Sequence, residues 1–158
     1  ALMEDKVAGL LCQKKCKQTS EPGIYVTRYK AKCAEHAGHD HISMIMPLYD
    51  GNLDQYPRNG ENFIKKVSIM EQTARGIAEM HQNGCVHRDL KLENILYSDF
   101  QGHGGGILVK VADFGLSATE SDIKSGAAGN PAHQPPEVRT NPNGIEAAAK
   151  QGTQADVW

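Results

Sequence analysis

The chain has 158 residues, of which 39% are hydrophobic, and its 17 Lys and Arg and 19 Asp and Glu give a formal net charge of −2. That length is typical of one folded domain, and a charge so close to zero argues against intrinsic disorder. A near-neutral chain also lacks the basic surface that binds nucleic acid or an anionic membrane, so we expect neither partner.

The first third of the chain predicts one helix and an antiparallel hairpin. Apolar residues at helical spacing predict a helix over residues 3–17. Alternating side chains predict strands over residues 24–32 and 41–46, joined by a polar turn at 35–39. A loop region punctuated by Gly and Pro follows, with room for one short helix at residues 53–56.

Residues 63–82 form the strongest predicted helix. Their apolar residues recur at alternating spacings of four and three, and Asn83-Gly84 is a typical helix end. We expect this apolar stripe to face the core. It consists of Phe63, Val67, Met70, Ala74, Ile77 and His81.

Three short strands are predicted after this helix, over residues 85–86, 95–97 and 107–111. The Gly-rich stretch at 98–106 is expected to be a loop. From residue 117 to residue 144 the chain is polar and without periodicity, and loops of that length are usually functional or mobile.

Two motifs, each directly after a predicted strand, carry the chemistry. Residues 87–94 read HRDLKLEN and residues 113–115 read DFG. Phosphoryl transfer needs a carboxylate that orients a hydroxyl, a cation near the migrating charge and oxygen ligands for Mg²⁺. The residues that supply these groups are, in that order, Asp89, Lys91, and the pair Asn94 and Asp113.

Together the two motifs resemble the eukaryotic protein kinases, whose catalytic loop is HRDLKxxN and whose metal-binding loop is DFG. Lys91 is the pattern of the serine/threonine branch. The resemblance implies transfer of phosphate from ATP, with Mg²⁺, to a Ser or Thr of a protein substrate. Asp89, Lys91 and Asn94 would be catalytic, and Asn94 and Asp113 would hold the metal. The alternative is a pseudokinase, a regulatory scaffold that binds nucleotide or protein.

The resemblance also implies an α+β, bilobal protein-kinase-like fold, of which this chain holds a part. Residues 1–46 would be the end of the small lobe with its hairpin, 47–52 the hinge, and 53–158 the first half of the helical large lobe. The activation segment would span 113–137. No Gly-rich phosphate loop and no Val-Ala-x-Lys strand precede Glu4. We therefore expect an internal piece of the domain, inactive by itself.

The hinge would bind the adenine of ATP, with Met46 at the gatekeeper position and Leu96 beneath the adenine ring. Plain core packing explains Met46 and Leu96 equally well. The residues implied for nucleotide binding are Met46, Pro47, Leu48, Tyr49, Leu96 and Asp113.

Several residues would be regulatory. Glu4 resembles the acidic residue that pairs with the ATP-binding Lys of the family. Phe114 and Gly115 belong to the metal loop, and Arg88 could pair with a phosphate that an upstream kinase adds to the activation segment. The candidate hydroxyls for that phosphate are Ser117, Thr119, Ser121 and Ser125.

Residues 129–137 resemble the substrate-positioning segment of the family, with two departures. Asn130 stands where Thr is usual, and His133 where an aromatic residue is usual. The Thr hydroxyl ordinarily links this segment to the catalytic Asp and Lys, and the Asn130 amide is the group that could replace it. Asp156 resembles the Asp that braces the catalytic loop.

The remaining signals favour an ordinary intracellular protein. The four cysteines are irregularly spaced and suit free thiols, and no signal peptide is visible. We expect a cytoplasmic location, with the nucleus as the alternative. Three histidines crowd the predicted hairpin turn: His36, His39 and His41. We interpret these three as solvated rather than metal-binding. His81 lies on the long helix, and we interpret it as a packed core residue.

Overall fold

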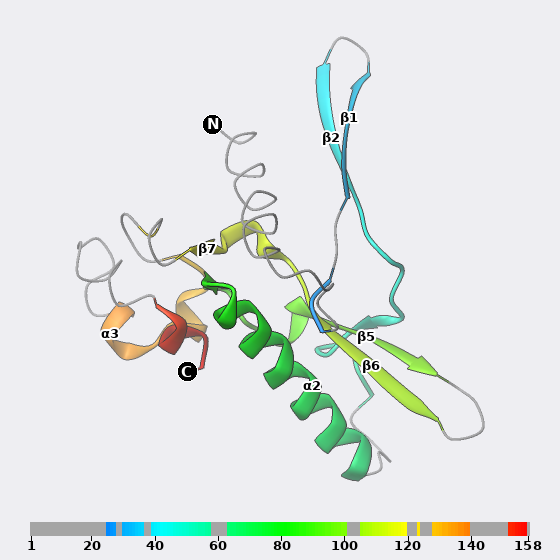
Figure 1. Ribbon diagram of the computed structural model, residues 1–158, viewed down its shortest axis with the longest axis vertical. Helices are drawn as coiled ribbons and strands as arrows, with labels where there is room; N and C mark the ends of the chain where they lie inside the picture. The colour runs from blue at the N-terminus through cyan, green and yellow to red at the C-terminus, as the bar shows by residue number, and fades with distance from the viewer. Residues whose placement is uncertain are drawn as a thin grey trace.

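The computed structural model describes residues 25–27, 30–36, 39–57, 63–100, 105–119, 123, 128–139 and 152–157, with the backbone alone for 30–36, 39–44 and 137. One long helix packs along a three-stranded antiparallel sheet, and a two-stranded hairpin extends away from this layer (Figure 1). Short elements carry the rest of the described chain. The helices are α2 (Phe63–Gln82) and α3 (Pro136–Arg139), with 3-10 turns at η1 (Leu92–Asn94), η2 (Phe114–Leu116), η4 (Pro131–His133) and η5 (Thr153–Asp156).

The hairpin forms as predicted, but its strands have other bounds. Strand β1 (Lys30–His36) pairs with β2 (His39–Ile45), with His36 opposite His39, so strand residues occupy the predicted turn. The earlier part of the predicted strand binds another partner. The nitrogen of Thr27 donates to the carbonyl of Val111 at 2.8 Å, and the nitrogen of Val111 donates to the carbonyl of Tyr25 at 2.9 Å. Alternation predicted an extended chain but could not name its partner. The helix expected at 3–17 lies outside the described residues.

The main sheet has the order β3-β5-β6, with both pairs antiparallel. Its strands are β3 (Gly51–Asn52), β5 (Ile95–Phe100) and β6 (Gly106–Val111). The loop expected at 98–106 is therefore shorter, because Ser98–Phe100 continue β5 and pair with β6. β3 was not predicted, since two residues carry no periodicity.

The short helix expected at 53–56 is absent, and the chain makes a turn there instead. The nitrogen of Leu53 donates to the carbonyls of Ile95 at 2.9 Å and Leu92 at 3.2 Å. These contacts give the Leu53 N–H acceptors that are not part of a helix, and they anchor the turn at the start of β5.

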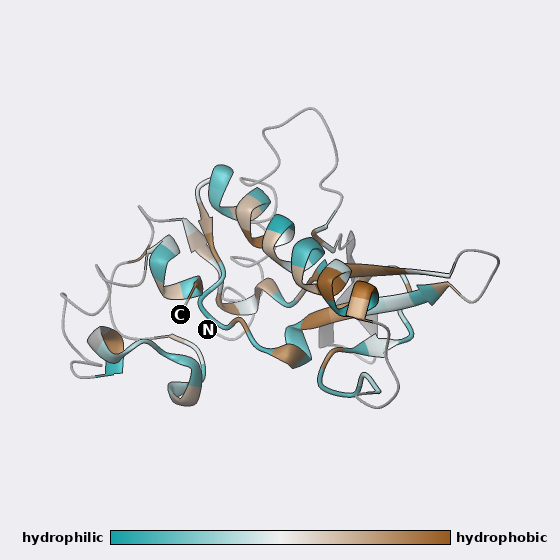
Figure 2. Ribbon diagram, turned by 90° about the horizontal axis from the view of Figure 1, so that it is seen from below, coloured by the Kyte–Doolittle hydropathy of each residue, from teal (hydrophilic) through white to brown (hydrophobic). Residues whose placement is uncertain are grey.

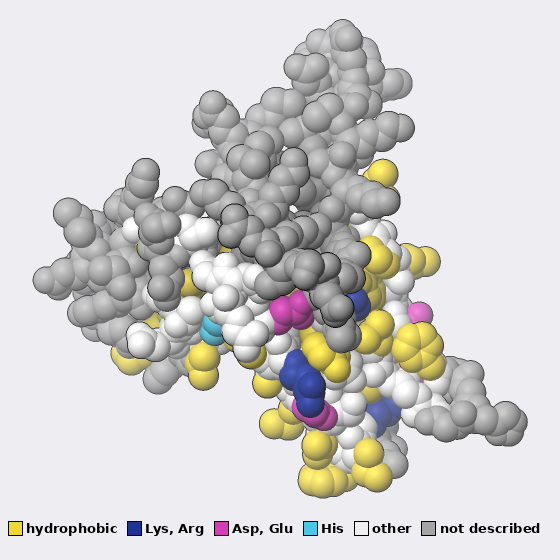
Figure 3. Space-filling view, in the orientation of Figure 1, with side chains coloured by type: hydrophobic (Ala, Val, Ile, Leu, Met, Phe, Trp, Pro, Cys, Tyr) yellow, Lys and Arg dark blue, Asp and Glu magenta, His cyan; other side chains and the backbone are white. Residues whose placement is uncertain are grey.

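Helix α2 has the predicted bounds but buries only part of the predicted stripe. Phe63 is 77% exposed, and Val67, Met70 and Ala74 are exposed too; yellow side chains lie over the N-terminal end of the helix (Figure 3). The prediction was wrong for these four residues, whereas Ile77 packs against the core and His81 is half-buried.

No helix among the described residues is long and apolar enough to cross a membrane.

The face of α2 that packs on β6 uses a glycine and a polar side chain. A Cβ on Gly76 would lie 2.8 Å from Val111 Cγ2 and 2.9 Å from the carbonyl oxygen of Tyr25, so the backbones approach closely there. The Gln72 amide donates from Nε2 to the carbonyl of Ile107 and accepts at Oε1 from the nitrogen of Val109, both at 2.8 Å. Figure 2 shows the hydrophobic stretch of the sheet alongside the helix.

The hydrophobic core lies between α2 and the sheet, and it extends to both motifs. Cys85 lies in β4 (Cys85–Val86), Ile95 begins β5, and Phe114 belongs to the DFG motif. The full buried cluster is Tyr56, Met80, Cys85, Ile95, Ile107, Val109, Val111 and Phe114. Core packing therefore fixes the points where the two functional loops begin and end.

The close approach at Gly76 gives a first prediction. Ala is normally the better residue inside a helix by about 1 kcal/mol. We expect Gly76→Ala nevertheless to lower the free energy of unfolding, by about 1–3 kcal/mol, because its Cβ overlaps Val111 and the Tyr25 backbone. Denaturant unfolding of the complete protein measures this. Ala78→Gly, at an exposed position of the same helix, is the control for propensity alone. A stabilised Gly76→Ala variant would contradict the close contact.

Candidate active site

The two motifs lie side by side because of the antiparallel pairing of β5 and β6. Residues 87–94 connect β4 to β5, and residues 112–115 follow β6. The register places Ile95, the first residue of β5, opposite Val111, the last residue of β6. The nitrogen of Ala112 continues the contact by donating to the carbonyl of Asn94 at 2.9 Å. The loops therefore share one end of the sheet.

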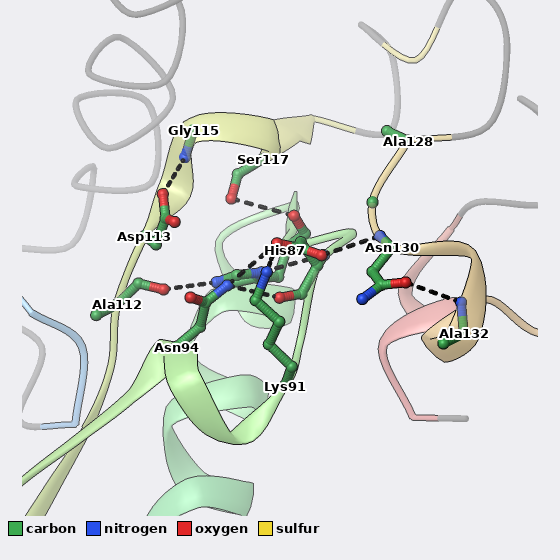
Figure 4. Close-up of polar contacts among 12 residues, drawn as sticks. His87, Lys91, Asn94, Ala112, Asp113, Gly115, Ser117, Ala128, Asn130 and Ala132 are labelled. Carbon is green, nitrogen blue, oxygen red and sulfur yellow. Dashed lines mark hydrogen bonds and ion pairs between the residues drawn. The ribbon is translucent and has the colours of Figure 1, made fainter. Parts of the chain in front are cut away.

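The Asp89 carboxylate accepts hydrogen bonds from three residues, Lys91, Asn94 and Asn130, which are labelled in Figure 4. Its Oδ2 accepts hydrogen bonds from Lys91 Nζ at 2.7 Å and from Asn94 Nδ2 at 3.2 Å. Its Oδ1 accepts from the backbone nitrogen of Asn130 at 3.1 Å. The structure thus brings together the three residues predicted to be catalytic and adds a donor from a distant segment.

The surroundings keep Asp89 and Lys91 charged. Burial by itself raises the pKa of the Asp89 carboxyl, but the hydrogen bonds from Lys91 and from the Asn130 backbone outweigh it, so the pKa lies below its ordinary value. The hydrogen bond to Asp89 raises the pKa of Lys91 above its usual value, against a smaller opposing effect of burial. At neutral pH the site therefore holds a carboxylate and an ammonium group in contact.

Asn94 and Asp113 offer oxygen atoms suited to Mg²⁺. Asn94 Nδ2 donates to the Asp89 carbonyl at 2.8 Å as well as to Asp89 Oδ2, which directs both amide hydrogens to Asp89 and leaves Oδ1 as an acceptor. Asp113 is exposed and adopts φ 60°, and its Oδ1 also accepts from the nitrogen of Gly115 at 3.3 Å. No group of three or more His, Cys, Asp or Glu that could hold a metal occurs among the described residues. This donor set fits Mg²⁺, which commonly uses one or two protein oxygens together with substrate phosphates.

His87 joins the two loops, a role that the motif alone did not predict. Its side chain is fully buried, and Nε2 donates to the carbonyl of Ala112 at 2.8 Å, while Nδ1 accepts from the nitrogen of Asp89 at 3.3 Å. A carbonyl accepts and a backbone N–H donates, which assigns these roles to the two ring nitrogens. The imidazole also lies 5.5 Å from the Phe114 ring, centroid to centroid.

Asp156 holds the loop from the opposite side. Its side chain is only 1% exposed, and its carboxylate accepts from the backbone nitrogens of His87 at 2.7 Å and Arg88 at 2.8 Å. Arg88 adopts φ 68°, the left-handed region that costs a residue with a Cβ about 1–2 kcal/mol. His81 Nε2 lies 2.9 Å from Asp156 Oδ2, so His81 does more than pack in the core.

The start of the predicted activation segment, at residues 116–119, is attached to residues 85–88. Arg88 Nε donates to the carbonyl of Leu116 at 2.7 Å. The Ser117 side chain is buried, and its hydroxyl donates to the carbonyl of His87 at 3.4 Å. Thr119 lies in β7 (Ala118–Thr119) opposite Cys85 of β4. A kinase could reach Ser117 only after this segment moved.

Three of the predicted regulatory residues lie outside the described residues: Glu4, Ser121 and Ser125. Among the others, Phe114 is buried in the core and Gly115 is exposed beside Asp113. Their regulatory roles stay predictions.

The Asn130 side-chain amide could have taken the place of the usual Thr hydroxyl on Asp89, but it does not contact Asp89. Its Oδ1 accepts from the nitrogen of Ala132 at 3.0 Å, so the side chain caps η4 while only the backbone nitrogen contacts Asp89. Gln134 is buried, and its Nε2 donates to the carbonyls of Ala128 at 2.9 Å and Gly129 at 3.2 Å. No pattern in the sequence pointed to Gln134, and His133 is exposed.

Two cavities flank these residues. One, of about 290 Å³, is lined by five of the six residues implied for nucleotide binding, all but Asp113, together with Gly51, Asn52 and Gln55. The five are Met46, Pro47, Leu48, Tyr49 and Leu96. The other, of about 320 Å³, adjoins Asp89 and is lined mainly by the segment from Ala128 to Pro135.

The chain is similar to protein kinases in both its family match and its sequence relatives. The protein kinase domain family matches residues 15–158. CBL-interacting serine/threonine-protein kinase 13 of Arabidopsis thaliana is 38% identical over 119 residues, which are 66% of this chain and 21% of that protein. Calcium/calmodulin-dependent protein kinase type 1 of Caenorhabditis elegans is 38% identical over 121 residues, 74% of this chain and 32% of that protein. The chain thus spans about a fifth to a third of these relatives.

The fold also matches a solved structure. The crystal structure of the yeast RNA Pol II CTD kinase CTDK-1 complex aligns over 96% of this chain and 45% of that chain, with a TM-score of 0.69 and 23% identity. The fold is therefore protein-kinase-like and partial, as expected.

The contacts of Asp156 give the second prediction. We expect Asp156→Asn to lower the free energy of unfolding by about 1–3 kcal/mol, because an amide has one acceptor oxygen for donors that now use both carboxylate oxygens. Thermal or denaturant unfolding of the complete protein measures this. Glu71→Gln, which breaks an exposed ion pair with Arg75, is the control and should change little. Equal effects of the two variants would contradict the bracing role.

Proposed function

Because the chain belongs to the protein kinase domain family, we propose that the protein that carries it transfers the γ-phosphoryl group of ATP to a Ser or Thr hydroxyl of a protein substrate. The observation that carries this proposal is the Asp89 carboxylate, which contacts Lys91 and Asn94 on one oxygen and a backbone N–H on the other. Such an arrangement leaves an ionised, oriented acceptor for a substrate hydroxyl.

The chain's own groups suit each part of the transfer. Asp89 orients the hydroxyl and takes its proton as the hydroxyl oxygen bonds to the γ-phosphorus and the bond to the ADP oxygen breaks. Lys91, 2.7 Å from the same carboxylate, offers its positive charge to the migrating phosphoryl group. Mg²⁺, when bound through Asn94 and Asp113, neutralises phosphate charge.

The cavity at the hinge is the proposed adenine site. It brings together the residues after β2 with Leu96 of β5. Among the described residues, no backbone hydrogen bond uses the main-chain groups of residues 46–48, which leaves them for the edge of a nucleobase. A concave, mostly apolar site with a few convergent polar groups is typical of small-ligand binding.

The Ser/Thr class of the acceptor rests on two observations. Lys91 follows the pattern of the serine/threonine branch, and the relatives carry serine/threonine-protein kinase names. An upstream kinase that phosphorylates the activation segment remains part of the same proposal, with Arg88 as the neighbouring cation.

The central test is Asp89→Asn in the complete protein. We expect kcat for phosphate transfer to fall by about 10²–10⁴-fold, because the hydroxyl loses its proton acceptor. ATP affinity, measured by calorimetry, should stay within about twofold, since Asp89 does not line the hinge cavity.

Glu71→Gln, an exposed carboxylate on α2, is the matched control and should keep full activity. An Asp89→Asn variant as active as the control would refute the mechanism. Bound ATP without transfer by the unsubstituted protein would instead favour a nucleotide-binding scaffold.

The acceptor class has its own test. With radiolabelled ATP and a peptide library in which the acceptor is Ser, Thr or Tyr, we expect label on Ser and Thr peptides at least about tenfold above Tyr peptides. A Ser or Thr hydroxyl lies close to the peptide backbone, whereas the Tyr hydroxyl lies a ring further from it, so one site does not place both alike. Preferential labelling of Tyr would overturn the Ser/Thr proposal while leaving phosphoryl transfer intact.

A further inference from the structure

Asn130, in the last part of the predicted activation segment, reaches Asp89 through one main-chain group. The nitrogen of Asn130 donates to Asp89 Oδ1 at 3.1 Å, whereas Lys91 and Asn94 both bind Oδ2. Among the described residues, this N–H is the group that donates a hydrogen bond to Asp89 Oδ1, and it comes from outside residues 87–94. The orientation of the carboxylate therefore depends on where the Gly129–Asn130 peptide unit lies.

We propose that Asn130 is a positioning residue, whose side chain caps the turn at residues 130–133 and thereby holds its own backbone N–H on the Asp89 carboxylate. The proposal rests on the proposed function, because it assigns how that function's proton acceptor is oriented. The coupling runs through the backbone, and the amide side chain never touches Asp89.

The local geometry carries this assignment. Asn130 Oδ1 accepts from the nitrogen of Ala132 at 3.0 Å, and the Asn130 carbonyl accepts from the nitrogen of His133 at 2.9 Å. Asn130 has φ −72° and ψ 123°, the extended conformation of an N-cap, and the following Pro131 disfavours the helical alternative. Among the described residues, Nδ2 of Asn130 has no hydrogen-bond partner, so the amide acts as an acceptor.

Two neighbours bring the same peptide unit against the catalytic loop. Gly129 has φ +87°, and a Cβ there would overlap the carbonyl oxygen of Arg88, so glycine permits the close approach. Gln134 Nε2 binds the Gly129 carbonyl at 3.2 Å, on the opposite side of the peptide unit from the N–H that faces Asp89. Gln134 and the Asn130 cap thus hold the unit from two directions.

Two substitutions of Asn130 distinguish a role of its side chain as an N-cap acceptor from a role as an amide donor. Asn130→Ser loses the amide but keeps an N-cap acceptor, whereas Asn130→Gln keeps the amide on a side chain that caps poorly. In the complete protein we expect Ser to keep kcat within about twofold. Gln and Asn130→Ala should lose about tenfold in kcat, the size expected from the loss of a cap. KM for ATP should not change, because residue 130 does not line the hinge cavity.

Asn83→Ala is the matched control. It removes a side-chain hydrogen bond to the carbonyl of Glu79 at 2.7 Å, away from Asp89, and should lower stability without lowering kcat. Activity is measured well below the melting temperature of every variant, so that a stability effect alone leaves kcat unchanged.

A second measurement does not need activity. Hydrogen exchange of the backbone amide of residue 130, followed by NMR, should be slow in the unsubstituted protein and in Asn130→Ser and about tenfold faster in the Ala and Gln variants. If no phosphate transfer is found, this exchange pattern still decides the positioning role, so the two proposals fail separately. Full kcat and slow exchange in Asn130→Ala, or activity retained by Gln and lost by Ser, would overturn the assignment.

Discussion

The buried carboxylate of Asp156 is the contact on which the rest of the site depends. A buried charge is costly unless hydrogen bonds satisfy it, and Asp156 receives two backbone N–H groups and the imidazole of His81. Those N–H groups belong to residues 87 and 88, where the backbone enters the left-handed region. The carboxylate thus offsets the strain that turns the next residue, Asp89, toward Lys91. A residue near the end of the described chain sets the geometry at its centre.

The loops of the site are joined mainly by hydrogen bonds between a side chain and a backbone group, rather than by hydrogen bonds between two side chains. His87 binds the carbonyl of Ala112, directly before the DFG motif, Ser117 binds the carbonyl of His87, and Asn130 offers its N–H to Asp89. The loops start and end on core residues of β4, β5 and β6, which makes their ends rigid while their side chains remain available. The charged pair of Asp89 and Lys91 is held inside this frame, so its two side chains are already oriented toward one another.

The sequence predicted which residues meet at the site better than it predicted the residues that hold them in place. The motif pointed to Asp89, Lys91 and Asn94, which the structure brings together, and periodicity placed both ends of α2. Periodicity found Ile77 but missed Gly76 and Gln72, which contact β6 closely and do not count as apolar. It also could not predict the partner of the first extended segment, because Val26 pairs with Val111, which is far away in the sequence. For Asn130, the same amide could cap or donate, and only the folded geometry separates these options.

The bridge from Gln72 to β6 has a consequence for association. In the order β3-β5-β6, β6 is an edge strand, and such edges present unpaired backbone groups that can recruit a strand from another molecule. Here the Gln72 amide binds the carbonyl of Ile107 and the N–H of Val109, and both outward groups of Val111 are bound by the Tyr25–Thr27 segment. One glutamine side chain therefore occupies two backbone groups of the β6 edge that a strand of another molecule would otherwise use. It protects this part of the edge without adding a strand to the fold.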